Sequence, residues 1–199
     1  SNSTAAEGAS NSSLYGYLSS FNSDGFSTVI GSNASSDGLN KNGTDFASWN
    51  WKAGTSFTND ASATGIGSID SAGSASDDSG FSIVSYTGTG SAGTIKHGLS
   101  SVPYMIIVKK RSATGSWNVY HSSLGNTKAI QLDLTSTPDT NSGYWNNTSP
   151  TSSVLSLGTS AQVNGSGVTY IGYIFSEKQA YSKFGSYTGN GNADGTFVY

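Results

Sequence analysis

The stretch GVTYIGYIF, residues 167–175, is apolar on both of the faces that an extended chain presents. A second stretch, VPYMIIVKK at residues 102–110, has the same property. Runs of this kind, rich in Val, Ile, Tyr and Phe, are typical of β-strands that are covered on both sides. We therefore predict that these two segments are the central strands of a sheet.

Four further segments have the length and composition of strands. In TKAIQLDL, residues 127–134, Ile130, Leu132 and Leu134 alternate with more polar residues, which predicts a half-buried antiparallel strand with these three side chains in the core. The other three segments are GFSIVSY at 80–86, SWNVYH at 116–121 and SVLSLG at 153–158. Short strands separated by Gly, Ser, Asn and Asp predict an all-β fold, an antiparallel β-sandwich of the jelly-roll or lectin-like type.

Parts of this predicted sandwich recur elsewhere in the chain. The phrase SYTGTGSAG at residues 85–93 returns as SYTGNGNAD at residues 186–194. SDGFSTVIGSN at 23–33 is similar to PTSSVLSLGTS at 150–160. Three aromatic positions also match at identical spacing, namely Phe46 with Tyr170, Trp49 with Tyr173, and Trp51 with Phe175. These matches predict tandem partial repeats, with Trp49 and Trp51 in structural positions.

The repeats divide the sequence into four predicted segments. They are a partial β unit at 1–51 that forms the rear half of a repeat, a Ser/Gly/Ala-rich linker at 52–79, a complete sandwich at 80–176, and the start of a further repeat or an exchanged strand at 177–199. Incomplete units leave strand edges and apolar faces uncovered. We therefore expect either flanking sequence or neighbouring chains of a homo-oligomer to complete the sheets.

Composition excludes several classes of function. Charged residues are 11% of the chain and the formal net charge is −3, which argues against a nucleic-acid partner. There is no Cys, so disulfides and thiolate metal sites are excluded. No apolar run reaches the ~20 residues that span a bilayer, and we predict no membrane insertion.

No catalytic motif appears in the sequence. The two histidines, His97 and His121, lie in positions typical of packing or of hydrogen bonds to the backbone. Most carboxylates sit in Gly- or Ser-flanked contexts that are typical of turns. We therefore predict that the protein is not an enzyme and has no catalytic residues, no cofactor and no metal site.

One loop carries the candidate binding residues. Trp145 lies in NSGYWNNTSP, residues 141–150, where no strand pattern explains it. Aromatic side chains bind sugar rings as readily as they fill cores, so we predict a glycan or partner contact formed by Tyr120, Tyr144, Trp145 and Asn146. The alternative is that Trp145 plugs the end of the sandwich.

Three phrases carry a resemblance to a known family. They are the H-G-L…V-P…M-I-I-V-K…R-S pattern at 97–112, S-W-N-V-Y-H at 116–121, and Y-S-K-F-G-S-Y-T-G-N-G at 181–191. Over residues 49–199 the chain resembles a repeat domain of unknown function found in tail, fibre and other virion-associated proteins of marine bacteriophages, cyanophages especially. The family offers no established catalytic residues to transfer.

The resemblance implies a structural, non-catalytic virion protein such as a tail fibre, an appendage or a decoration protein. Its expected location is the extracellular virion. Its expected partners are further copies of itself or other virion proteins, together with host-surface polysaccharide. The alternative is a secreted bacterial repeat adhesin or an extracellular filament subunit.

Overall fold

The structure is a computed structural model that describes residues 4–7, 11–33 and 39–197. The chain divides into an N-terminal unit, residues 5–51, and a main unit, residues 1–4 and 52–199. Strands dominate the described residues, and every described helix is four residues long. The predicted all-β class is confirmed. No described helix is long or apolar enough to cross a bilayer.

The main unit contains ten strands and three single-turn helices in its described part. The strands are β3 (Thr55–Asn59), β4 (Ser71–Ser76), β5 (Phe81–Thr87), β6 (Gly93–Lys96), β7 (Met105–Lys110), β8 (Asn118–His121), β9 (Lys128–Gln131), β10 (Asp139–Thr140), β11 (Val154–Leu157) and β12 (Thr169–Phe175). The helices are α2 (Ala61–Thr64), α3 (Ser142–Trp145) and α4 (Ala161–Asn164).

Eight of these strands form one antiparallel sheet in the order β10-β9-β8-β7-β12-β5-β4-β3. β12 lies between β5 and β7 and pairs with β5 along its whole length, from Thr169 opposite Thr87 to Phe175 opposite Phe81. The prediction that 102–110 and 167–175 hold the central strands is therefore confirmed. Their two apolar faces suit this position because a central strand is covered on both sides.

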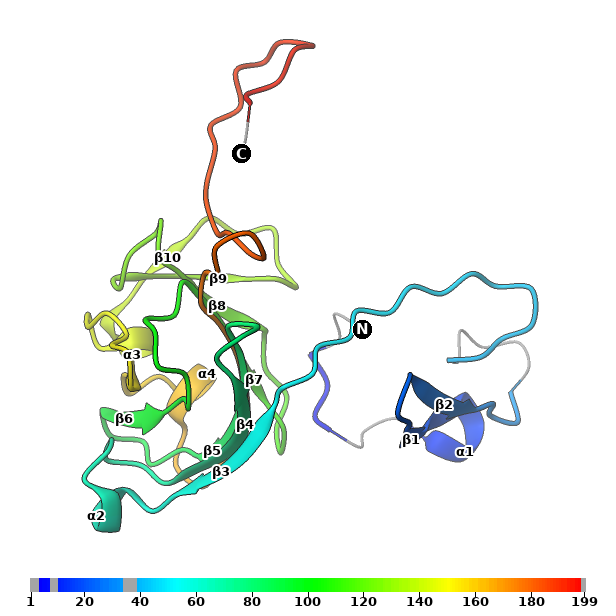
Figure 1. The fold of residues 1–199 in the computed structure, drawn as a ribbon, viewed down its shortest axis with the longest axis horizontal. Helices are drawn as coiled ribbons and strands as arrows, with labels where there is room; N and C mark the ends of the chain where they lie inside the picture. Colours follow the sequence, from blue (N-terminus) through cyan, green and yellow to red (C-terminus); the bar gives the residue numbers. More distant parts are fainter. Residues whose placement is uncertain (1–3, 8–10, 34–38, 198–199) are drawn as a thin grey trace. The chain divides into compact units, whose positions relative to one another are not determined.

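A second layer covers one face of this sheet. It consists of the two-stranded sheet β11-β6 and the helices α3 and α4, which Figure 1 shows on one side of the large sheet. Tyr86 and Tyr170, on neighbouring strands, stack with their ring centroids 5.1 Å apart. Both hydroxyl groups donate hydrogen bonds of 2.6 Å to carbonyl oxygens of α4, at Val163 and Ala161. The stacked pair therefore ties the second layer to the centre of the sheet.

Asn164, the last residue of α4, is a buried polar link between loops. Its Oδ1 accepts a hydrogen bond from the Thr89 N–H at 2.9 Å. Its Nδ2 donates to the carbonyl oxygens of Ser91 at 2.7 Å and Gly158 at 2.8 Å. Asn164 is fully buried, and its hydrogen bond to the Gly158 carbonyl oxygen is buried with it.

We expect Asn164→Ala to lower the free energy of unfolding by about 2–4 kcal/mol, because it removes three hydrogen bonds and leaves the buried Gly158 carbonyl oxygen without its partner. Asn164→Asp should lower the free energy of unfolding further, because a buried carboxylate would face two carbonyl oxygens. Urea denaturation measures both effects. Asn126→Ala is the control, since its side chain makes an exposed hydrogen bond to Ser149, and it should change stability by less than about 0.5 kcal/mol. Equal effects of the Asn164 and Asn126 substitutions would contradict the assigned role.

The strand predicted at 127–134 forms as β9, but it buries the face opposite to the one predicted from Ile130, Leu132 and Leu134. β9 ends at Gln131, and Leu132 and Leu134 are exposed. Ala129 is the fully buried residue, in the same core cluster as Trp145. The Trp145 indole donates a hydrogen bond to the Lys128 carbonyl oxygen at 3.0 Å. The bulky indole occupies the space beside β9, so only a small side chain can face the core there.

Residues 52–79 differ from the linker that their composition predicts. They form β3, α2 and β4 at one edge of the large sheet. Small side chains permit this because backbones approach closely: a Cβ added at Gly73 would lie 2.2 Å from the Ile83 carbonyl oxygen. Low hydrophobicity indicated a flexible chain, but backbone pairing with β5 orders the segment.

The N-terminal unit contains α1 (Ser12–Tyr15) and a hairpin of β1 (Tyr17–Phe21) and β2 (Phe26–Val29). β2 and β11, which the sequence comparison aligns to within one residue, are both strands. Residues 44–54, by contrast, form no strand although they align with β12, and Trp49 is 76% exposed. The repeat therefore remains a prediction, and the expected structural placement of Trp49 and Trp51 does not fit their exposure.

Candidate functional site

The structure places three of the four predicted contact residues in the core. Trp145 is only 2% exposed, and Tyr120 and Tyr144 are buried as well. The rings of Tyr120 and Trp145 meet edge to face, with centroids 5.9 Å apart. The Tyr144 hydroxyl accepts a hydrogen bond from Gln131 Nε2 at 3.1 Å. These rings therefore pack between β8, β9 and α3 and offer no face to a glycan.

Asn146, the fourth predicted residue, is exposed but ends α3 in the left-handed conformation, with φ 52°. Its backbone N–H donates to the Ser142 carbonyl oxygen at 2.9 Å, as a helix C-cap does. The four residues therefore form no common surface. The glycan-contact prediction at this loop is corrected in favour of its alternative, a Trp145 that closes the sandwich.

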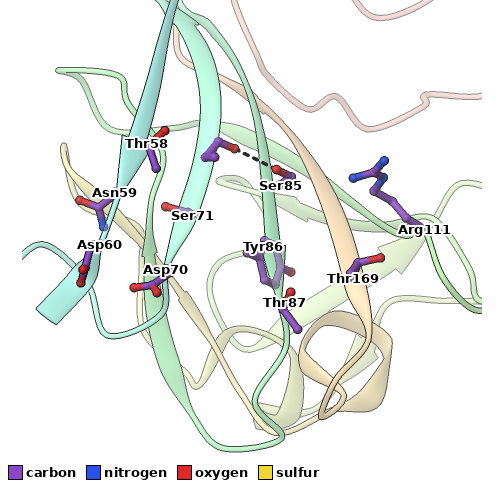
Figure 2. A pocket seen from close by; sticks show the side chains of 11 residues that line it. Thr58, Asn59, Asp60, Asp70, Ser71, Ser85, Tyr86, Thr87, Arg111 and Thr169 are labelled. Carbon is purple, nitrogen blue, oxygen red and sulfur yellow. Dashed lines mark hydrogen bonds between the residues drawn. The ribbon is translucent and has the colours of Figure 1, made fainter.

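A polar hollow lies elsewhere on the main unit and is shown in Figure 2. We call it the sheet hollow. Its volume is about 360 Å³, and its lining comes from β3, β4, β5, the start of β12 and the residue after β7. The lining residues are Thr58, Asn59, Asp60, Asp70, Ser71, Ala72, Ser85, Tyr86, Thr87, Arg111 and Thr169.

Small side chains on adjacent strands create this hollow. Ala72 on β4 pairs with Ser85 on β5, and the Ser85 hydroxyl donates to the Ala72 carbonyl oxygen at 3.1 Å, the dashed line in Figure 2. Thr87 pairs with Thr169 on β12. No large side chain rises from these positions, so the lining presents mainly hydroxyl groups.

Charged groups stand at opposite sides of the sheet hollow. Figure 2 shows Asp60 and Asp70 on one side and Arg111 on the other. Asp60 Oδ1 accepts the Ser62 hydroxyl at 2.6 Å and the Ala63 N–H at 3.1 Å, and these hydrogen bonds lower the pKa of the carboxyl. Asp70 Oδ1 accepts the Ala61 N–H at 2.8 Å. Both aspartates therefore serve first to cap α2.

This arrangement can hold a polar molecule by hydrogen bonds. In the described parts of the chain, no three His, Asp or Glu side chains converge as a metal site requires. Each histidine ring is hydrogen-bonded to the backbone: His97 to Thr151 O and Leu99 N, and His121 Nδ1 to Ser123 N. Neither ring lies among the residues of the sheet hollow. The hollow therefore offers binding groups without an adjacent histidine base.

Comparison with known families gives one match. A family profile described as Domain of unknown function (DUF7483) covers residues 1–199. The chain belongs to this family. The match spans both the N-terminal unit and the main unit. No curated protein and no solved structure matches the chain.

Asp60 and Asp70 were not among the predicted site residues because both lie in the segment that was predicted to be a linker. A local signal was present in D-A-S-A-T-G, residues 60–65. An Asp at the start of a short segment that is closed by Gly is the pattern of a capped helical turn. Gly65 adopts the left-handed conformation that this position requires, with φ 68°. Arg111 directly follows the predicted central strand at 102–110, and only the sheet order brings it opposite Asp60.

Proposed function

We propose that the chain is a non-catalytic structural protein of a bacteriophage particle, as part of a tail fibre, an appendage or a decoration. In this proposal it assembles into an oligomer on the extracellular virion and contacts host-surface glycans. The three phrases at 97–112, 116–121 and 181–191 support the phage setting through their resemblance to virion-associated proteins. The surface of Ser, Thr, Asn and Gly supports a role in contact with water and neighbouring molecules.

The proposed assembly into an oligomer is supported by a set of aromatic side chains that are exposed in the single chain. Phe21 is 81% exposed and Trp49 76% in the N-terminal unit. Tyr181 and Tyr187 are likewise exposed in the main unit. Covering one such side chain stabilises by about 1.5–3 kcal/mol. A chain that leaves several of them exposed can gain stability by covering them in contacts between molecules.

The hairpin of the N-terminal unit supports the same conclusion. β1 and β2 pair only with each other among the described strands, and Tyr17, Leu18 and Phe26 on them are exposed. A two-stranded hairpin is marginally stable alone in water. Packing of this hairpin against a second copy would cover its apolar side chains and add to its stability.

We expect light scattering to give a mass that is a multiple of the 20.4 kDa chain. The double substitution Phe21→Ser, Trp49→Ser should raise the dissociation constant of the oligomer by about 10–100-fold, because both aromatic anchors are lost. Leu132→Ser, at an exposed apolar residue of the main unit, is the matched control and should leave the mass unchanged. A monomer at all protein concentrations would refute the assembly proposal.

The setting is tested separately, by mass spectrometry of purified phage particles and of the medium of uninfected host cells. We expect peptides of this chain in particles, in a fixed ratio to capsid protein. Peptides only in the medium of uninfected cells would instead identify the alternative, a secreted adhesin or filament subunit.

A further inference from the structure

A second hollow opens beside the edge strand β3, and we call it the edge hollow. Its volume is about 510 Å³, within the range of small-molecule sites. Its walls come from β3, from β4 and the turn that follows it, and from the end of β6. It shares no residue with the sheet hollow. The residues that matter for its chemistry are Phe57, Asp77, Asp78, Lys96 and the hydroxyl-bearing Thr55 and Ser76.

Two glycines let the backbone pack closely around the edge hollow, whose lining includes Phe57. Gly98 has φ +80°, and a Cβ added there would lie 2.4 Å from Phe57 Cε1. Gly54 has φ +78°, and its Cβ would lie 2.4 Å from the Ala75 carbonyl oxygen. Glycine is therefore required at both walls, because any side chain would displace the ring or β4.

Lys96 completes an aromatic and cationic pair. Its Nζ lies 5.5 Å from the centroid of the Phe57 ring, within the range of a cation–π contact. Both side chains are half-buried, on β6 and β3. The ammonium group of Lys96 therefore lies at the hollow, where it can donate hydrogen bonds to a ligand.

Acceptor groups line the same hollow. Asp77 Oδ1 accepts the Ser100 N–H at 2.8 Å, and this hydrogen bond is the main cause that lowers the pKa of Asp77. The carboxyl is thus ionised at neutral pH, and its second oxygen can accept hydrogen bonds from a ligand. Asp78 is exposed beside it. The charged side chains of the lining are two carboxylates and one ammonium.

We propose that the edge hollow binds a neutral pyranose unit of a polysaccharide, with the C–H face of the sugar on Phe57 and its hydroxyl groups on Asp77, Asp78 and Lys96. A pyranose has an apolar ring face and a rim of hydroxyls that both donate and accept, which matches an aromatic ring beside carboxylates and an ammonium. The two carboxylates of the lining would repel the carboxylate of an anionic sugar, whereas Lys178, whose charge also acts on Asp77, lies outside the lining. This inference rests on the proposed contact with host-surface glycans and assigns that contact to the edge hollow.

The test is a titration of the isotope-labelled full chain followed by amide NMR shifts. The probes are the methyl glycosides of glucose, galactose and mannose, with glucuronate as the anionic probe and glycerol as a polyol without a ring. We expect at least one methyl glycoside to shift the amides of residues 54–57, 75–78 and 96–98 in a saturable way, with millimolar affinity. Glucuronate and glycerol should shift them weakly and without saturation.

Three variants make the test specific to the edge hollow. Phe57→Leu removes the ring but keeps an apolar side chain, and it should weaken binding by about tenfold. Asp78→Asn lies at an exposed position, so it preserves the fold and should also weaken binding. Phe184→Leu removes a half-buried ring that packs on Phe175 outside the hollow, and it should leave binding unchanged. Well-dispersed spectra of all three variants establish that they are folded.

Absence of saturable shifts at ~50 mM of every glycoside would overturn the inference. Shifts confined to the sheet hollow, or binding that survives both Phe57→Leu and Asp78→Asn, would overturn it as well. None of these results bears on the mass of the oligomer or on the presence of the chain in particles. Failure of this inference is therefore distinguishable from failure of the proposed structural role.

Discussion

Replacing Trp145 by alanine is expected to lower the free energy of unfolding by about 3–5 kcal/mol, the usual cost of removing a large buried aromatic side chain. The indole is 2% exposed, contacts the rings of Tyr120 and Tyr144, and donates to the Lys128 carbonyl oxygen. Its loss leaves a cavity and an unpaired carbonyl group. The midpoint of thermal unfolding should fall by roughly 6–20 °C.

Two companion variants separate packing from surface contact. Trp145→Phe keeps an aromatic ring but loses the hydrogen bond to Lys128, so its cost should be intermediate, about 1–3 kcal/mol. Trp49→Ala removes an indole that is 76% exposed, and it should change monomer stability by less than about 0.5 kcal/mol. If Trp145→Ala left stability intact but abolished glycan binding, the surface contact first predicted for Trp145 would be restored.

The second large effect concerns pH and arises at His97. This ring is fully buried at the end of β6, with Nδ1 accepting the Leu99 N–H at 3.2 Å and Nε2 3.1 Å from the Thr151 carbonyl oxygen. The network assigns the neutral tautomer with hydrogen on Nε2. A proton on Nδ1 would face the Leu99 N–H. Burial is the main cause that lowers the His97 pKa below 6.5, and the Thr151 carbonyl and the Asp77 carboxylate oppose it only in part.

Because the pKa of His97 is lower in the folded chain, the unfolded chain binds the proton more readily. Above pH 6.5 both states are neutral at this ring and its contribution to stability is constant. As pH falls below 6.5 the free energy of unfolding should decrease, by up to about 1.4 kcal/mol per pH unit, until the pKa of the folded state is reached. Urea denaturation between pH 7.5 and 5 measures the slope, above the range in which the carboxyl groups titrate.

His97→Gln should abolish this slope and reduce stability at pH 7.5, because the buried contacts change. His121→Gln is the matched control, because His121 is only half-buried and His97 remains in place. It should retain the slope. If the slope persisted in His97→Gln and disappeared in His121→Gln, the pH dependence of stability would arise at His121, and the assignment to His97 would be wrong.

Much of the fold followed from local pattern. β7 and β12 were predictable as central strands because each has apolar side chains on both faces. Apolar side chains favour burial, so a strand with two apolar faces must be covered on both sides. The buried face of β9 was not predictable. Its alternation favoured Ile130, Leu132 and Leu134, but the Trp145 indole, 16 positions beyond Ala129, occupies the space on that side of the strand.

The candidate sites depended still more on tertiary contacts. Phe57 and Lys96 are far apart in the sequence, and only the meeting of β3 with the end of β6 brings the ammonium over the ring. The segment that supplies Phe57 looked unstructured because its residues are small and polar. Its order comes from hydrogen bonds that β4 makes with β5, which composition does not record.

The phrase S-Y-T-G, which occurs twice in the chain, separates what the sequence determines from what the tertiary structure determines. The sequence by itself determined an all-β protein with β-prone phrases between turns. At residues 85–88 the phrase runs through the end of β5, and Tyr86 is 5% exposed against Tyr170. At residues 186–189 the same letters form no strand, and Tyr187 is 71% exposed. A strand takes its hydrogen bonds from other segments, so only the tertiary structure, with β4 and β12 on either side, decided which copy became one.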